Sequence, residues 1–189
     1  MTAADAIELY AELQALGINV WIDGGWGVDA LLGAQTRPHK DLDIAIEEKD
    51  LSRLTAALKA RGYREVIRHS QWNFELSDDR GRQVDVHSFV LAPDGNVEKG
   101  IMYPTGSLTG TGTIRGHAVR CVSPEWMVKF HSGYELKKKD FQDVSALCEK
   151  IWDRTSAGMR SVQKLELVLS ASLQLSPNKP VLPVTCYSI

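Results

Sequence analysis

The segment DLDIAI, residues 41–46, alternates acidic or small residues with aliphatic ones at every position. Asp41 and Asp43 fall on one face of such a segment and the aliphatic residues on the other, which is the period of a half-buried β-strand. Because side chains two positions apart on a strand project the same way, the two carboxylates lie together. Carboxylates this close repel unless a proton or a cation lies between them, and Mg²⁺ suits such a pair. The pattern predicts either a metal site or the solvent face of an edge strand.

Two glycines stand between an apolar run and a short helical segment. Residues 18–22, INVWI, are mostly β-branched and predict a buried strand. Gly24 and Gly25 interrupt it, and residues 26–32 predict a short helix that stops at Gly33. Glycine lets the backbone approach a ligand closely, and a helix N-terminus presents N–H groups to an anion. The chain has neither GxGxxG nor GxxxxGK(S/T), so the pair indicates a phosphate-binding turn or simply a tight connection.

A third aspartate occurs in a second alternating segment, RQVDVHSF. Its valines predict a buried face, so Asp85 and His87 share the opposite face with Gln83. A carboxylate on a neighbouring strand completes a cation site, and it can also accept a proton from a hydroxyl nucleophile. We expect Asp85 to serve as a metal ligand and as the catalytic base. A solvated strand face is the alternative, which the repetition of the pattern makes weaker.

The remaining chain predicts an α+β fold. Apolar spacing predicts helices at residues 3–16, 51–61 and 141–152, and a further helix that begins at Pro124. Thr2, Asp50 and Ser123 are the expected N-caps. Strand-like runs occupy residues 63–69, 72–77 and 83–90, a loop occupies 91–112, and a small hairpin surrounds Arg115. This order indicates a mixed β-sheet with helices on one side and a short helical C-terminal part.

Composition limits the classes of function. The 189 residues carry a formal net charge of −2, which does not indicate a general nucleic-acid or membrane-surface binder. The start of the chain lacks signal-peptide character, and the three cysteines have no metal-binding spacing, so we expect a cytoplasmic protein with reduced thiols. We expect one domain at residues 1–154. Residues 155–189 form an extension in which we find no chemistry; it is a disordered tail, an added strand or a partner surface.

The order of these elements resembles the nucleotidyltransferase superfamily that includes DNA polymerase β. Within it, WIDGGWGVDALLG followed by TRPHKDLDI is similar to the small lincosamide nucleotidyltransferases, and next to the aminoglycoside 2″-adenylyltransferases. VDVHSF and FHSGYELKKKDFQDV also resemble the lincosamide group. The resemblance extends over roughly residues 7–152.

The resemblance implies Mg²⁺-dependent transfer of AMP from ATP, or from another NTP, to a hydroxyl of a small antibiotic. The implied acceptor is a lincosamide, and the implied consequence is drug resistance. An aminoglycoside adenylyltransferase and a non-catalytic, antitoxin-like module of the same fold are the alternatives. Two metal ions held by Asp41, Asp43 and Asp85 are expected. We expect no nucleic-acid or membrane partner, and a homodimer is an open alternative.

Several further residues are expected to contact the substrates. By resemblance, Arg37 lies near the nucleotide phosphates with Gly24 and Gly25, and Lys129 binds phosphate from its helix; both also suit a solvated surface. Glu75 and His87 are weaker candidates for contacts with the acceptor, on the strand faces next to Asp85. Asp29 and His39 are expected to be structural, with Asp29 anchoring the turn after the glycines and His39 orienting the loop. Few acidic residues on these strands argue weakly against a polycationic acceptor.

Overall fold

The computed structural model describes residues 1–131 and 138–152, and an eight-stranded mixed sheet forms its centre. The strand order is β3-β4-β5-β2-β1-β8-β7, with β6 paired to β5. Neighbours β1/β8 and β2/β5 are parallel and the other pairs are antiparallel, which confirms the predicted mixed sheet. The bounds are β1 Val20–Ile22, β2 Asp41–Glu47, β3 Arg64–Arg68, β4 Asn73–Ser77, β5 Gln83–Leu91, β6 Val97–Gly100, β7 Gly110–Ile114 and β8 His117–Cys121.

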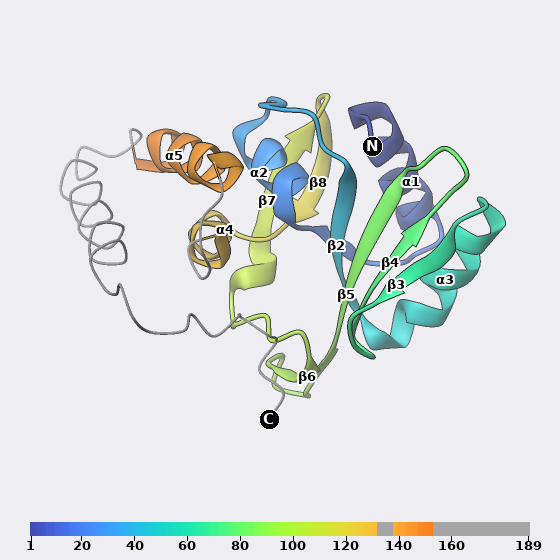
Figure 1. Cartoon of the computed structure of the whole chain (residues 1–189). Helices are drawn as coiled ribbons and strands as arrows, with labels where there is room; N and C mark the ends of the chain where they lie inside the picture. Colours follow the sequence, from blue (N-terminus) through green and yellow to red (C-terminus); the bar gives the residue numbers. More distant parts are fainter. Residues whose placement is uncertain (132–137, 153–189) are drawn as a thin grey trace, which may run out of the picture.

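Helices cover both faces of the sheet, so the expectation of helices on one side was wrong. The helices are α1 Ala3–Ala15, α2 Gly24–Leu32, α3 Leu51–Ala60, α4 Pro124–His131 and α5 Lys138–Trp152, with short 3₁₀ turns η1 Glu48–Asp50 and η2 Ser107–Thr109. Figure 1 shows α1 and α3 together on one side of β2, and α2, α4 and α5 together on the other. The reason is that β2 is apolar on one face and carries the small residue Ala45 beside its aspartates on the other, so both faces accept a helical layer.

Two hydrophobic cores follow from this arrangement. The first joins α1 and α3 to the face of β2 that carries Leu42, Ile44 and Ile46. The second lies on the opposite face, where Ala45 and Phe89 pack with residues of α2, α4 and α5. Asp41 and Asp43 share the face of Ala45, so the predicted carboxylates point toward the second layer of helices.

The capping and stop residues predicted from the sequence mark most helix ends correctly, and a few predictions differ from the structure. The side chain of Thr2 caps α1 in a capping box, and Gly33 ends α2 with φ +73°. Asp50 makes no capping hydrogen bond; its carboxylate accepts from Arg53 at 3.0 Å instead. The expected loop at residues 91–112 contains β6, η2 and the start of β7. These pieces are too short and too rich in glycine to show a period in the sequence.

Cys121 and Cys148 are free thiols in the described part of the chain. Burial raises the pKa of Cys121 to about 12 and that of Cys148 to about 11, so both remain protonated and unreactive at neutral pH. Cys186 and the extension at residues 155–189 lie outside the described residues. Within residues 1–131 and 138–152, no helix is long and apolar enough to cross a membrane.

Candidate active site

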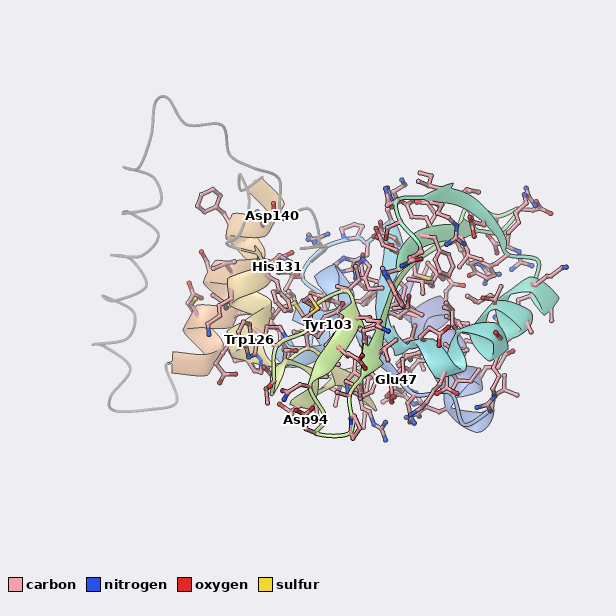
Figure 2. All side chains as sticks on the ribbon, turned by 90° about the horizontal axis from the view of Figure 1, so that it is seen from below. Glu47, Asp94, Tyr103, Trp126, His131 and Asp140 are labelled. Carbon is pink, nitrogen blue, oxygen red and sulfur yellow. The ribbon has the colours of Figure 1, made fainter. Side chains whose placement is uncertain are left out.

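A cavity of about 230 Å³ lies where the N-terminus of α2 meets the acidic face of the sheet. It is lined by residues from α2, β2, β5, the loop before β2 and the two C-terminal helices: Asp23, Gly24, Gly25, Arg37, His39, Asp41, Asp43, His87, Phe130, His131 and Asp140. The structure therefore brings together the double glycine, the paired aspartates, Arg37 and His87, which the sequence places far apart. Figure 2 shows His131 and Asp140 on the part of the molecule that α4 and α5 form.

The three predicted carboxylates come from two parallel neighbours. Asp43 on β2 pairs in register with Asp85 on β5, and Asp41 lies two positions before Asp43 on the same face. Burial raises the pKa of Asp43 to about 7, and the negative charges of Asp41, Asp23 and Asp85 act in the same direction, against the influence of His87. The charged form of the Asp43 carboxylate is therefore destabilised at neutral pH. A cation bound nearby would stabilise it.

The donor set fits a divalent cation that is shared with a substrate. Among the residues that the structure describes, no group of three His, Cys, Asp or Glu side chains is already arranged as a metal cage. Mg²⁺ does not need one, because it usually takes one or two carboxylates and completes its shell with water and phosphate oxygens. Asp41 and Asp43 offer hard oxygen donors, and no hydrogen bond to the Asp43 carboxylate is found within the described part of the chain. This open pair fits magnesium held jointly by protein and nucleotide.

The two glycines allow the first turn of α2 to approach other side chains of the site. Gly24 has φ +54°, and a Cβ there would lie 2.1 Å from Oδ2 of Asp43. A Cβ on Gly25 would lie 2.4 Å from Nδ1 of His39 and 2.7 Å from Nη2 of Arg37. The close approach at Gly25 is therefore to the protein itself, whereas the sequence suggested an approach to phosphate. The result places a helix N-terminus beside the paired aspartates.

Asp23 and Tyr103, whose polar contacts the sequence did not indicate, connect the glycine turn to Asp85. Oδ1 of Asp23 accepts the Gly24 N–H at 2.8 Å, and Oδ2 accepts the Tyr103 hydroxyl at 2.8 Å. Since the one hydroxyl proton of Tyr103 goes to Asp23, its oxygen accepts from Nδ1 of His87, which lies 3.2 Å away. Nε2 of His87 lies 3.4 Å from Oδ2 of Asp85. A continuous polar chain thus runs from the helix N-terminus to the predicted base.

The surroundings of His87 favour its protonated form. Burial acts to lower its pKa, but the carboxylates of Asp23 and Asp85 outweigh burial and hold the pKa well above its usual value. In the same way burial acts to raise the pKa of Asp23, but His87, Gly24 and Tyr103 outweigh it and lower that pKa. Burial together with the charge of Asp23 raises the pKa of Tyr103 well above its usual value, so its proton stays in place. An imidazolium cannot accept a proton, so His87 is unsuited to act as the base.

Asp85 and Glu75 differ in how they are engaged. Oδ1 of Asp85 accepts from Nδ2 of Asn73 at 2.7 Å, which fixes the carboxylate. Glu75 is directly opposite Asp85 on β4, but its Oε1 lies 3.0 Å from Nε2 of His69. Neither lines the cavity wall. Asp85 reaches the cavity through His87, whereas Glu75 lies one strand further away.

The two predicted phosphate-binding cations have different positions. Arg37 lines the cavity and makes two hydrogen bonds with Asp143 of α5, at 3.2 Å and 2.7 Å. Lys129 is exposed, and its Nζ lies 4.0 Å from the ring centroid of Trp126 as a cation–π contact. Helix α4 turns Phe130 and His131 toward the cavity instead. The structure brings Arg37 to the site and does not bring Lys129 there.

Comparison with known proteins gives a consistent set of relatives. The family model for aminoglycoside-2″-adenylyltransferases matches residues 5–147. A lincosamide resistance protein from Staphylococcus haemolyticus is 30% identical over 139 residues, which cover 71% of this chain and 86% of that protein. A 2″-aminoglycoside nucleotidyltransferase from Escherichia coli is 26% identical over 129 residues, which cover 64% of this chain and 67% of that protein.

Solved structures with the same fold carry similar names. The lincomycin-bound lincosamide antibiotic adenylyltransferase LnuA superposes with a TM-score of 0.70 at 25% identity, covering 78% of this chain and 96% of that one. The complex of ANT(2″)-Ia with adenylyl-2″-tobramycin has a TM-score of 0.69 at 22% identity, covering 90% and 96%. The second likeness concerns the fold alone.

Proposed function

The chain belongs to the aminoglycoside-2″-adenylyltransferase family, and on this premise we propose that it transfers AMP from ATP to a hydroxyl of a lincosamide antibiotic. It is a nucleotidyltransferase whose relatives act in antibiotic resistance. One observation carries the assignment of the site: three carboxylates, Asp41, Asp43 and Asp85, lie on one face of two parallel strands beside the N-terminus of α2. We propose that residues 1–154 contain the whole catalytic domain, as the family match supports.

The residues of the site divide the work of nucleotidyl transfer. Asp41 and Asp43, with Asp85, would hold one or two magnesium ions, which neutralise charge on the triphosphate when bound. Asp85 accepts the proton of the acceptor hydroxyl as its oxygen attacks the α-phosphorus. The bond from the α-phosphorus to its bridging oxygen breaks, and pyrophosphate leaves with the bonding electron pair. Asn73 fixes Oδ1 of Asp85, and Oδ2 lies 3.4 Å from Nε2 of His87, which lines the cavity.

Charged groups around the α2 N-terminus stabilise the leaving pyrophosphate. The N–H of Gly25 belongs to the positive end of a helix, whereas the N–H of Gly24 donates to Asp23. Arg37 adds planar N–H donors, which suit phosphate oxygens, and it shares its positive charge with Asp143. Lys129 is the weaker candidate for this role, because a contact with phosphate would require it to leave Trp126.

The acceptor preference rests on similarity and on charge. The lincosamide relative has the higher identity and the more complete coverage, 30% and 86% against 26% and 67%. Aminoglycosides are polycations and need several free acidic groups in their site. Here Asp23 is already engaged by Tyr103 and His87, and the imidazolium of His87 repels an ammonium group. We propose Phe130, His87 and, more weakly, Glu75 as contacts for the acceptor.

An aminoglycoside acceptor is the second candidate, because the matching family model is named for that activity. The two candidates separate in a panel of lincosamides and aminoglycosides incubated with ATP and magnesium. We expect pyrophosphate release and a product with one added AMP for a lincosamide. An AMP adduct on aminoglycosides alone would select the second candidate. Nucleotide binding without transfer to either class would favour the non-catalytic alternative.

A further inference from the structure

His39 is buried at the edge of the cavity between two charged side chains. Its Nε2 lies 2.5 Å from Oδ2 of Asp29, and its Nδ1 lies 3.1 Å from Nη1 of Arg37. The other oxygen of Asp29 accepts from the backbone N–H and the hydroxyl of Thr36, at 3.0 Å and 2.6 Å. Asp29 therefore holds two points of the loop that carries Arg37.

The hydrogen-bond partners of His39 determine its tautomer. Arginine has only N–H donors, so Nδ1 of His39 must accept the bond from Arg37. The ring proton is then on Nε2, where the Asp29 carboxylate accepts it. A second proton on Nδ1 would point at the guanidinium of Arg37. His39 thus bridges the Asp29 carboxylate and the Arg37 guanidinium, and it passes the orienting effect of the carboxylate to the arginine.

Packing keeps this arrangement in one place. The rings of His39 and Trp26 lie 4.5 Å apart between centroids, and His39 is 7% exposed. Gly25 makes room for this arrangement, since a Cβ there would lie 2.4 Å from Nδ1 of His39 and 2.7 Å from Nη2 of Arg37. On its other side Arg37 is fixed by the two bonds to Asp143. The guanidinium is held from two directions and still lines the cavity.

We propose that Asp29 and His39 form a positioning relay that aims Arg37 at the departing pyrophosphate. The proposal rests on the proposed function, in which Arg37 neutralises charge on that group. His39 and Asp29 touch no reacting atom; they act through Arg37. Because productive transfer needs the guanidinium within a narrow geometry, loss of the relay should lower the rate although Arg37 itself remains.

Two substitutions separate the halves of the relay. His39→Gln retains a donor near the Nε2 position for Asp29 and loses the acceptor for Arg37. His39→Asn retains an acceptor near the Nδ1 position for Arg37 and loses the donor to Asp29. We expect His39→Gln to lower kcat/KM for ATP by about 10–100-fold, the usual cost of removing an outer partner, and His39→Asn to lower it less. Affinity for inorganic pyrophosphate, titrated calorimetrically with and without magnesium, should follow the same order.

The deciding comparison repeats His39→Gln in an Arg37→Ala background. A residue that acts only through Arg37 causes no further loss once Arg37 is gone. Thr36→Val is the matched control, because it removes the hydroxyl bond to Oδ1 of Asp29 but keeps the backbone N–H bond and both contacts of His39. We expect it to lower thermal stability and to leave pyrophosphate affinity unchanged. If His39→Gln does not fold, Asp29→Asn provides the same comparison in both backgrounds.

The outcomes are distinct. Equal losses from His39→Gln with and without Arg37 would overturn the relay and leave a structural role for His39. A folded His39→Gln protein with wild-type affinity for pyrophosphate would also overturn the relay. If Arg37→Ala still lowered the rate of transfer in that case, the proposed function would remain intact. If the wild-type protein bound pyrophosphate but transferred AMP to no acceptor, the proposed function would fail and the binding comparison would still test the relay.

Discussion

Asp43 and Asp85 lie directly opposite each other on the parallel strands β2 and β5, with the first turn of α2 packed against Asp43. Two carboxylates in this relationship, with Asp41 next to them, are costly in a protein without a cation. Burial and these neighbouring charges raise the pKa of Asp43 to about 7. A cation bound here, as we propose for magnesium, would favour the charged carboxylate.

Replacing the base should affect chemistry more than binding. Asp85→Asn keeps the size of the side chain and one possible ligand oxygen but cannot accept the acceptor's proton. We expect kcat to fall by about 10²–10⁴-fold while ATP and magnesium still bind. Single-turnover transfer at saturating magnesium and ATP measures this. Full recovery of the rate at high magnesium would mean that Asp85 is only a metal ligand. The base would then have to be a residue other than His87, whose protonated form cannot accept a proton.

Removing the charge of Asp43 should stabilise the metal-free protein. Because its folded pKa is raised from 3.8 to about 7, the folded state binds the proton more tightly, and stability falls as pH rises through that interval. In a chelator at pH 8, Asp43→Asn should melt a few degrees higher than the wild type, at ~2–4 °C per kcal/mol for a chain of this size. The difference should vanish near pH 4. A lower melting temperature at pH 8 would contradict the predicted strain.

The same Asp43→Asn protein should lose the response to magnesium. Wild-type protein with a non-hydrolysable ATP analogue should melt higher when magnesium is added, because the ligand binds only the folded state. The variant should show a much smaller shift and no transfer. An undiminished magnesium shift would place the metal elsewhere.

His87 should make stability depend on pH above neutrality. Its folded pKa is raised well above 6.5, so its contribution is fully present below pH 6.5 and is lost as pH rises through the folded pKa. His87→Gln lacks this titration. In a chelator between pH 6 and 9, the wild type should lose its advantage over the variant as pH rises. A constant difference across that range would mean that His87 is neutral in the folded protein.

Truncation after Arg154 should preserve transfer. Every residue of the proposed site lies before position 152, and the family match ends at residue 147. Equal kcat and KM in the full chain and the truncated chain would confirm the boundary. A folded but inactive truncated protein would show that the extension contributes to a site, in the same molecule or in a second copy.

Alternation in the sequence was sufficient to predict which carboxylates lie together at the proposed site. DLDIAI and RQVDVHSF each specify which side chains share a face, and parallel pairing then places Asp43 opposite Asp85. The apolar spacing likewise predicted α1, α3, β4 and β5 near their observed bounds, because burial of one face imposes a period on the local sequence. The mixed sheet follows from their order.

The contacts that complete the site are not local. Tyr103 and Asp23 are 80 residues apart in the sequence, and Asp143 and Arg37 are 106 apart. No short motif therefore predicts either hydrogen-bonded pair. Asp23 could have been suspected, since it directly precedes the glycines and suits an N-cap. For Lys129 the helix period held the missing signal: Met127 and His131 mark the buried face of α4, and Lys129 lies off it.

Transfer of AMP to lincomycin is the most direct test of the central claim. The wild-type protein and Asp43→Asn are each incubated with lincomycin, ATP and magnesium, and the antibiotic is analysed by mass spectrometry. We expect the wild-type protein to add one AMP to each lincomycin and to release one pyrophosphate for each, and we expect no adduct with the variant. An equal amount of adduct from the Asp43→Asn protein would contradict the proposed role of Asp43. The absence of any adduct, with both proteins folded and able to bind ATP, would contradict the proposed transfer to a lincosamide.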